Sequence, residues 1–342
     1  MGSFHLLMYA HWGQEPTPSP LNGERAGVRG EKAQSCEFPK IRFTERENLQ
    51  PGRVVLACGL AVCLSACSPL HSGTSPGGLR RALTFHASFD HGTEADYAFG
   101  DHSLFTARAK DSRAAAQRGL GGTNVAMLAM GEGRFGNALR FPRKQAALVF
   151  YQAAENFSYN TTNWAGTVSF WLSVDPAVDL ELGFCDPIQI TAHAWNDAAF
   201  FVEFEKRRTI PFRLGVYADF KVWNPENRKW DEIPAMNRPL VTVEEPPFGR
   251  GKWTHVVFTF ERFNTGKADG LAKLYLDGVL AGALPPRTQT FTWDDRQTSI
   301  MLGLGYVGLF DELSLFNRAL SAEEVKTLYG LERGVTGLLR PQ

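Results

Sequence analysis

The sequence predicts an all-β fold, a two-sheet antiparallel β-sandwich of the jelly-roll type that ends in a short helix. Short apolar segments separated by turn residues recur from residue 83 onward, and no long amphipathic helix interrupts them. The chain has 33 Gly and 25 Phe among 342 residues, which suits a turn-rich sheet protein with a large aromatic core. Because sandwiches of about 200 to 250 residues are common as single domains, we expect one large domain after an N-terminal extension.

The expected strands follow one another at short intervals along this domain. Each is a run of apolar residues, alternating or continuous, bounded by turn-forming residues. They cover residues 83–89, 138–141, 147–151, 167–174, 188–193, 200–206, 212–219, 254–260, 272–276, 299–302 and 309–316. Asp277-Gly278 is the strongest hairpin signal, because both central positions of a type I′ turn need a positive φ.

The last strand carries a clear alternation of side chains. A regular strand over 309–316 would separate its side chains into two sets. These are Leu309, Asp311, Leu313 and Leu315 on one face, and Phe310, Glu312, Ser314 and Phe316 on the other.

A capped helix follows this strand. Ser321 and Glu324 have the spacing of a capping box, in which each side chain bonds the backbone N–H of the other residue. Val325 and Leu328 give the helix an apolar stripe, and Gly330 is placed to end it.

Composition limits the classes of function. Lys plus Arg and Asp plus Glu are 36 each, so the net charge of zero and the absence of a long basic run argue against nucleic-acid binding. Four of the five cysteines, Cys36, Cys58, Cys63 and Cys67, precede the domain. Cys185 is left alone within it and is expected to be buried, so a disulfide framework inside the domain is excluded.

The N-terminal part resembles an export signal. Residues 54–66 form an apolar run after Arg53 that is too short to span a bilayer. The run ends in Leu64-Ser65-Ala66-Cys67, which resembles the bacterial lipobox and implies lipidation of Cys67. The alternative is a buried apolar strand that contains cysteines.

These features predict the organisation of the N-terminal region. We expect residues 49–67 to be a lipoprotein signal peptide and the Pro-, Gly- and Ser-rich residues 68–82 to be a flexible tether. Two or more acyl chains on Cys67 would anchor the protein stably to a membrane of the cell envelope. Residues 1–48 are either a disordered extension or the product of a start site assigned too far upstream.

Five ordered motifs resemble the laminin-G-like domains of the concanavalin A-like lectin/glucanase superfamily. They are the opening strand FHASFD (85–90), the corner GRFGNALRF (133–141), the core strand GTVSFWL (166–172), the strand WTHVV (253–257) and the hairpin LYLDG (274–278). The closing strand with Asp311-Glu312, followed by Asn317-Arg318-Ala319-Leu320-Ser321 and the helix, completes the pattern. The resemblance implies a concanavalin A-like domain over 83–332 and a tail over 333–342. It covers residues 97–130 and 220–251 least.

The resemblance also implies a structural calcium site. In this superfamily an Asp of the last strand and oxygens of the opening strand and a Gly-containing turn often hold the ion, and here Asp311 and Asp90 match the first two. A carbonyl of Gly136 or Asn137 would supply a third of the six to eight oxygens that calcium prefers. The alternative is that both aspartates bond backbone amides of the turn.

Glu203 and Glu205 form the pair of acids expected of a glycan-cleaving enzyme. Two positions apart on one strand, they share a face with Cα atoms about 6.5 Å apart. The laminarinase-like pattern, however, places an Asp between two such acids and surrounds them with Trp. Here the neighbours include three cations, 206–208. We therefore interpret the pair as an exposed, charge-balanced strand end rather than catalytic.

Trp223 and Trp230 are the candidate ligand-binding residues. They lie in the Pro-rich insertion 220–251, and indole faces stack on sugar rings. The alternative is that they hold this loop against the sheet.

Together these features predict an exported, lipid-anchored envelope protein whose non-catalytic laminin-G-like domain binds carbohydrate. Its partners would be a glycan or other cell-surface ligand, and the membrane through the lipid anchor only. A glycoside hydrolase or polysaccharide lyase, and a structural or adhesive protein without a small ligand, are the alternatives.

Overall fold

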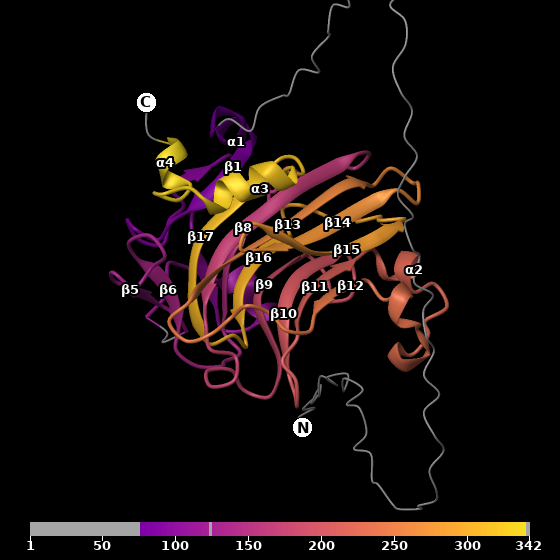
Figure 1. Cartoon of the computed structure of the whole chain (residues 1–342), viewed down its shortest axis with the longest axis horizontal. Helices are drawn as coiled ribbons and strands as arrows, with labels where there is room; N and C mark the ends of the chain where they lie inside the picture. The colour runs from indigo at the N-terminus through magenta and orange to yellow at the C-terminus, as the bar shows by residue number, and fades with distance from the viewer. Residues whose placement is uncertain (1–75, 123–124, 340–342) are drawn as a thin grey trace, which may run out of the picture. The chain divides into compact units, whose positions relative to one another are not determined.

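Two antiparallel sheets face each other across an apolar layer (Figure 1). The computed structural model describes residues 76–122 and 125–339. The expected extension 1–48, the signal peptide 49–67 and Cys67 lie outside the described residues. The observed architecture confirms the predicted all-β, two-sheet sandwich with a short C-terminal helix.

The first sheet has nine strands in the order β15-β14-β13-β8-β17-β1-β2, with β6 paired to β17 and β5 paired to β6. Its strands are β1 (Leu83–Ala87), β2 (Tyr97–Ala98), β5 (Met127–Ala129), β6 (Ala138–Phe141), β8 (Trp164–Ser173), β13 (Trp253–Phe263), β14 (Gly270–Leu276), β15 (Val279–Arg287) and β17 (Gly308–Phe316). Asp277 and Gly278, between β14 and β15, have φ values of 49° and 78°, so the predicted positive-φ hairpin turn is confirmed.

The second sheet has eight strands in the order β12-β11-β10-β9-β16-β7-β3-β4. They are β3 (Phe105–Ala107), β4 (Gln117–Arg118), β7 (Leu148–Gln152), β9 (Gly183–Thr191), β10 (Ala199–Lys206), β11 (Phe212–Tyr217), β12 (Leu240–Val243) and β16 (Ser299–Leu304). Every strand predicted from the sequence is present, although some bounds differ. The short strands β2, β3, β4, β5 and β12 were not predicted, and they lie in the two segments least covered by the family resemblance.

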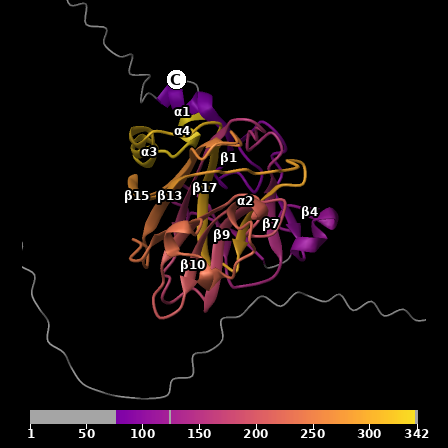
Figure 2. The same ribbon diagram turned by 90° about the vertical axis from the view of Figure 1, so that its right-hand side faces the viewer.

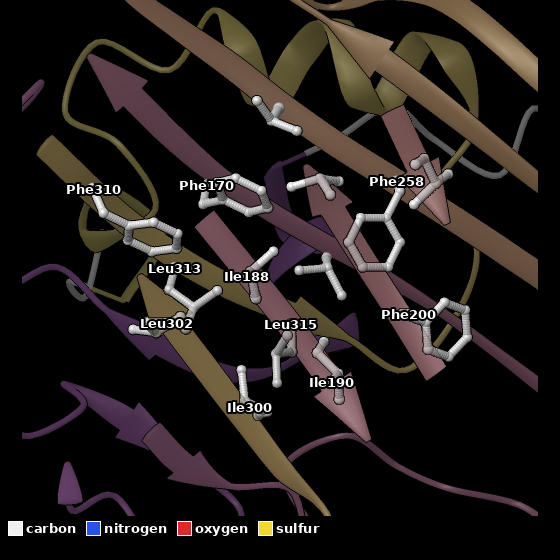
Figure 3. Close-up of a cluster of buried hydrophobic side chains, with 14 of the residues drawn as sticks. Phe170, Ile188, Ile190, Phe200, Phe258, Ile300, Leu302, Phe310, Leu313 and Leu315 are labelled. Atoms are coloured by element: carbon white, nitrogen blue, oxygen red, sulfur yellow. The ribbon is translucent and has the colours of Figure 1, made fainter. Parts of the chain in front are cut away.

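Aromatic and branched side chains fill the space between the sheets (Figure 3). Phe170 on β8 and Phe310 on β17 stack with ring centroids 5.0 Å apart. Phe200 on β10 lies 5.8 Å from Phe258 on β13 and so joins the two sheets. Cys185 is fully buried, as predicted.

The predicted alternation along β17 is wrong because the strand contains a bulge. The pairing of β17 with β8 shifts between Asp311 and Ser314, and Glu312 has a φ of 56°. This extra residue lets Phe310 and Leu313 both point into the core, although a regular strand would place them on opposite faces. Asp311 therefore lies on the outer face of the sheet.

Three helices cover part of the outer face of the nine-stranded sheet, and two of them lie within the predicted tether and tail. They are α1 (Pro76–Ala82), α3 (Ala322–Tyr329) and α4 (Thr336–Leu339), which lie together in both views (Figures 1 and 2). The last seven residues of the expected tether 68–82 thus form a helix, and the expected tail 333–342 contains the helix α4.

Apolar contacts explain these differences. Leu79 of α1 and Val335, just before α4, are buried in one cluster with residues of α3, and Arg80 Nη1 donates to the carbonyl of Leu338 at 2.7 Å. Packing thus outweighs the weak helix propensity of Gly77 and Gly78. The predicted capping box of α3 is confirmed, with Ser321 and Glu324 bonded reciprocally. Among the described residues no helix is long and apolar enough to cross a membrane.

The eight-stranded sheet is covered only in part. The 3₁₀ helix η1 (Lys110–Ala115) lies over its β7 and β16 side, where Arg113 Nη1 donates to Ser299 Oγ at 3.0 Å. The insertion 220–251 holds α2 (Phe220–Trp223), η2 (Trp230–Glu232), η3 (Ala235–Asn237) and the edge strand β12. It lies at the other edge of this sheet, beside β11 and β12 (Figure 1).

Candidate functional site

Four charged side chains lie together on the outer face of the eight-stranded sheet. Asp186 is on β9, Glu203 and Glu205 are on β10, and Arg213 is on β11; we call them the acid–arginine cluster. Alternate residues of these strands, such as Phe204, point into the core, so the period of two places the charged residues outside.

Strand register explains why the cluster forms. β10 and β11 pair so that Glu203 lies opposite Arg213. The guanidinium donates from Nη2 to Glu203 Oε1 at 2.6 Å, and its Nη1 lies 2.5 Å from Glu205 Oε2. One arginine thus neutralises both acids of the i, i+2 pair, with short charge-assisted bonds.

The structure corrects the interpretation of Glu203 and Glu205 as an exposed strand end. The two residues are 6% and 8% exposed. Of the three neighbouring cations, Arg207 pairs with Glu205, whereas Lys206 Nζ donates to the carbonyl of Ala177 at 2.7 Å. The cation that balances both acids comes instead from the adjacent strand.

Burial shifts the titration of the cluster. It raises the pKa of Glu203 to about 7, against the opposing charge of Arg213. Burial and the Glu203 carboxylate raise the pKa of Asp186. Arg213 Nε, and Nε2 of the adjacent Gln189, are buried donors without an acceptor among the described residues. Most buried donors in proteins are hydrogen-bonded, so both of these groups retain the capacity to bond a further acceptor.

Exposed aromatic rings lie at both ends of the cluster. Trp195, in the loop between β9 and β10, is 45% exposed, and its ring centroid lies 5.5 Å from that of Tyr217 and 6.4 Å from that of Phe201. Phe184 on β9 is 50% exposed, and the Arg213 guanidinium lies 5.5 Å from its ring centroid. The face therefore combines charged groups with two accessible rings.

The two tryptophans predicted to bind ligand are both half-buried and have different surroundings. Trp223 donates from Nε1 to the carbonyl of Asn196 at 2.8 Å, and its ring meets Tyr217 edge-on at 5.0 Å. Trp230 lies under the Arg238 guanidinium, 4.6 Å from the ring centroid. Trp223 thus borders the face near Trp195. The contacts of Trp223 and Trp230 match the alternative in which these two tryptophans hold the insertion in place.

The two predicted calcium ligands clasp one turn between β5 and β6. Asp311 Oδ2 accepts hydrogen bonds from the backbone N–H groups of Arg134 and Phe135, at 2.7 and 3.2 Å, and its Oδ1 accepts from Glu312 N–H at 2.8 Å. Asp90 Oδ1 accepts from Asn137 N–H at 2.8 Å.

Glycine is required where this turn meets Asp90. Gly136 has a φ of 66°, and a Cβ there would collide with the Asp90 carboxylate. The observed hydrogen bonds match the alternative in which Asp90 and Asp311 bond backbone amides of the turn. Among residues 76–122 and 125–339 no group of three or more His, Cys, Asp or Glu is placed to hold a metal ion. Calcium binding through Asp90 and Asp311 stays a prediction.

Further buried polar groups fasten the C-terminal segment to the nine-stranded sheet. His86 Nε2 lies 3.0 Å from Thr336 Oγ1 and 3.8 Å from Glu312 Oε1, and Glu312 Oε2 accepts from Val335 N–H at 2.9 Å. Burial lowers the pKa of His86 to about 4 and raises that of Glu312 to about 8. Both groups are thus favoured in their neutral forms beneath α4.

A cleft of about 390 Å³ lies where β6, β8 and β17 meet at one end of the sandwich. Its arginines already have acid partners, since Arg140 pairs with Glu132 and Arg250 Nε lies 3.7 Å from Asp175 Oδ2. We place the candidate site on the eight-stranded sheet instead, because there buried charges adjoin the exposed rings of Trp195 and Phe184.

Most residues of this face were missed from the sequence. The signal for Arg213 was the hairpin register, because the connection between β10 and β11 places it opposite Glu203. The place of Asp186 and Gln189 beside the glutamates depends on the pairing of β9 with β10, and no local sequence pattern predicts that pairing. Trp195 was recognisable only as a tryptophan in the loop between two predicted strands.

A two-layer antiparallel sandwich closed by its first and last strands defines a jelly-roll class of domain. The sequence matches the laminin G model for the concanavalin A-like lectin/glucanases superfamily over residues 146–326. The chain belongs to this superfamily, which confirms the resemblance drawn from the motifs. No curated protein matches the sequence.

Several solved structures are similar in fold. Domain 4 of AbnA, a GH43 extracellular arabinanase from Geobacillus stearothermophilus in complex with arabinotriose, has 17% sequence identity and a TM-score of 0.43, covering 71% of this chain and 96% of that chain. Trypanosoma rangeli sialidase has 16% identity and a TM-score of 0.43, with 73% and 32% covered. The binding domain of Paraclostridial Mosquitocidal Protein 1 has 13% identity and a TM-score of 0.39, with 73% and 52% covered.

Proposed function

We propose that this domain binds carbohydrate, without cleaving it, on the outer face of the eight-stranded sheet. The observation that carries the proposal is the exposed Trp195 ring beside the acid–arginine cluster. Sugar recognition needs a flat apolar surface for the ring faces and fixed polar groups for the hydroxyls. Asp186, Glu203 and Arg213 would supply the polar groups.

The pairing of the acids favours binding over cleavage. A general acid must release its proton to the leaving group, and a second carboxylate must act as base or nucleophile. Here Arg213 bonds Glu203 and lies against Glu205, which restricts the movement of both carboxyl groups. Such a pair is better suited to accept hydrogen bonds from sugar hydroxyls.

A glycan array followed by calorimetry on the hits tests the proposal. Trp195→Ala should weaken binding about tenfold through loss of the stacking surface. Phe99→Ala, which removes a 52% exposed ring outside the candidate site, should have no effect. Binding lost in Trp223→Ala or Trp230→Ala at unchanged melting temperature, and kept in Trp195→Ala, would move the site into the insertion. No glycan bound by the wild type would favour a structural or adhesive role.

A glycan-cleaving enzyme is the second candidate, supported by the raised pKa of Glu203. A carboxyl with a pKa of about 7 is protonated often enough near neutral pH to act as a general acid. Reducing-sugar release by the wild type that disappears in Glu203→Gln would establish this activity. Binding without any release would exclude it for the glycan used.

We also propose that the protein is exported and held at the cell envelope by lipid on Cys67. The proposal depends on the apolar run and the Leu-Ser-Ala-Cys motif of the sequence. Growth with a labelled fatty acid should label the wild type and not Cys67→Ser. Label retained in Cys67→Ser, or absent from the wild type, would contradict it.

A further inference from the structure

We propose that the candidate face binds the interior of an extended, neutral glycan chain that runs along β10 from Trp195 to Phe184. This inference rests on the proposed carbohydrate binding and adds the ligand's length, direction and charge. It excludes recognition of a single sugar or of a chain end as the main mode of binding.

The two accessible rings set the length. Trp195 contacts the ring of Phe201, whereas Phe184 lies opposite Glu205 in the pairing of β9 and β10. Phe201 and Glu205 are four residues apart on β10, so the two ring contacts are separated by about 13 Å along the strand. This distance exceeds one sugar ring with its linkage. A ligand that touches both rings must therefore contain several consecutive units.

Polar groups between the rings suit the hydroxyls of such a chain. Gln189 lies opposite Phe201, and Glu203 lies opposite Arg213, so donors and acceptors alternate across the path. Gln189 Nε2 and Arg213 Nε are the buried donors that lack an acceptor. A small movement of neighbouring side chains would let a ligand hydroxyl accept from either of them.

The charge of the face indicates a neutral ligand. Arg213 and Arg207 already pair with Glu203 and Glu205, and Asp186 adds a third carboxylate in the same cluster. Burial raises the pKa of Asp186, and Arg213, Lys144 and Lys110 lie near enough to act on its carboxyl, so the acids and cations of the face nearly balance. Such a face offers no excess positive charge to a strongly anionic chain, and it suits a neutral one.

The surroundings of the face direct the chain along the strand. On one side Lys110 of the segment around η1 donates to the carbonyl of His193, and Arg113 donates to Ser299. On the other side Trp223 of the insertion packs against Tyr217 on β11. Both segments border the path at its Trp195 end, because Lys110 and Trp223 donate to carbonyls of the loop that carries Trp195. Phe184, at the other end, is 50% exposed, so a chain can continue beyond it.

Calorimetry with ladders of neutral gluco-, xylo- and arabino-oligosaccharides, from one to six units, tests the inference on the wild-type protein. For the ladder that binds, affinity should rise at least about tenfold between the monosaccharide and the tetrasaccharide as both rings become engaged. Reduction of the chain's terminal sugar to an alditol should leave hexasaccharide affinity unchanged. Equal affinity for monosaccharide and hexasaccharide, or loss of binding on terminal reduction, would overturn the inference and leave carbohydrate binding intact.

Variants distinguish the two ends of the path. Phe184→Ala and Trp195→Ala should each weaken hexasaccharide binding about two- to tenfold, and Phe99→Ala should not. If Trp195→Ala weakens binding and Phe184→Ala does not, the ligand ends before Phe184 and the extended chain is refuted. If no ladder and no array glycan binds, the proposed function itself fails.

Discussion

Buried carboxylates lie on the outer faces of both sheets, and the two groups are stabilised in different ways. On the nine-stranded sheet, Asp311 and Glu312 accept backbone N–H bonds from the segments that they hold. On the eight-stranded sheet, Glu203 and Glu205 are balanced by the side chain of Arg213. Backbone bonds fix chain segments, whereas side-chain pairs next to exposed rings can exchange partners with a ligand. The comparison thus separates a structural role from a binding role for the same residue types.

Removal of the Asp311 carboxylate should have the largest effect on stability. Asp311→Ala leaves the backbone N–H groups of Arg134, Phe135 and Glu312 without their acceptor, which should cost about 3 kcal/mol or more of unfolding free energy. Urea unfolding measures this loss, with Asp231→Ala at an exposed position as the control. A loss within about 0.5 kcal/mol, typical of surface substitutions, would contradict the structural role.

Removal of Arg213 should cost less stability and should depend on pH. Arg213→Ala leaves Glu203 and Glu205 without their shared cation, at a cost of about 2 kcal/mol because both side chains are largely buried but still reach the surface. The pKa of Glu203 is already about 7, so protonation at pH 5 removes part of the penalty. The destabilisation should be larger at pH 8 than at pH 5.

Two measurements on Arg213→Ala separate its roles. Chemical unfolding at both pH values gives the stability loss, and calorimetry with a glycan bound by the wild type gives the binding loss. An equal loss of stability at pH 5 and pH 8 would show that Glu203 does not have the raised pKa. Unchanged glycan affinity would remove the cluster from the binding face.

Glu312→Gln should change the slope of stability with pH. Burial raises the folded-state pKa of Glu312 from 4.5 to about 8, so the folded protein binds more protons than the unfolded chain between these values. Stability from this group is present below pH 4.5 and is lost as pH rises to about 8. His86, with a pKa lowered to about 4, acts in the opposite direction between pH 4 and 6.5.

The contribution of the Glu312 carboxyl to unfolding free energy is therefore measured above pH 6.5, outside the range in which His86 acts. Between pH 6.5 and 8, Glu312→Gln should flatten the decline of unfolding free energy by up to about 1.4 kcal/mol per pH unit. Glu332→Gln, at an exposed position, is the matched control. Parallel pH profiles for wild type and Glu312→Gln would show that Glu312 keeps an ordinary pKa.

The sequence predicts the sandwich because its strands and turns are local patterns. Alternation, the Asp277-Gly278 turn and the Ser321 capping box each act over a few residues. The bulge at Glu312 was not predictable in this way, since it depends on pairing with β8. Likewise α1 forms because Leu79 is buried against segments far away in sequence. Long-range packing, rather than propensity, decides these two features.

The candidate site was less predictable than the fold for the same reason. The pair Glu203 and Glu205 was recognisable as a shared face, but its environment depends on Arg213 in the next strand. Exposure of Trp195 and Phe184 depends on which parts of the sheet the segment around η1 and the insertion cover. A sequence motif gives the residues of one strand, whereas a binding face combines residues of several strands.

The smallest expected effect concerns calcium and the turn held by Asp90 and Asp311. Both oxygens of Asp311 accept backbone N–H bonds, whereas Asp90 Oδ2 accepts none from the described residues. Calcium at this turn would bind mainly through that oxygen, carbonyls and water, and so weakly. Millimolar calcium should then raise the melting temperature of the wild type by about 2 °C and leave Asp90→Asn unchanged, because a ligand that binds only the folded state must stabilise it. No shift in the wild type at saturating calcium would leave the turn held by its hydrogen bonds to Asp90 and Asp311 alone.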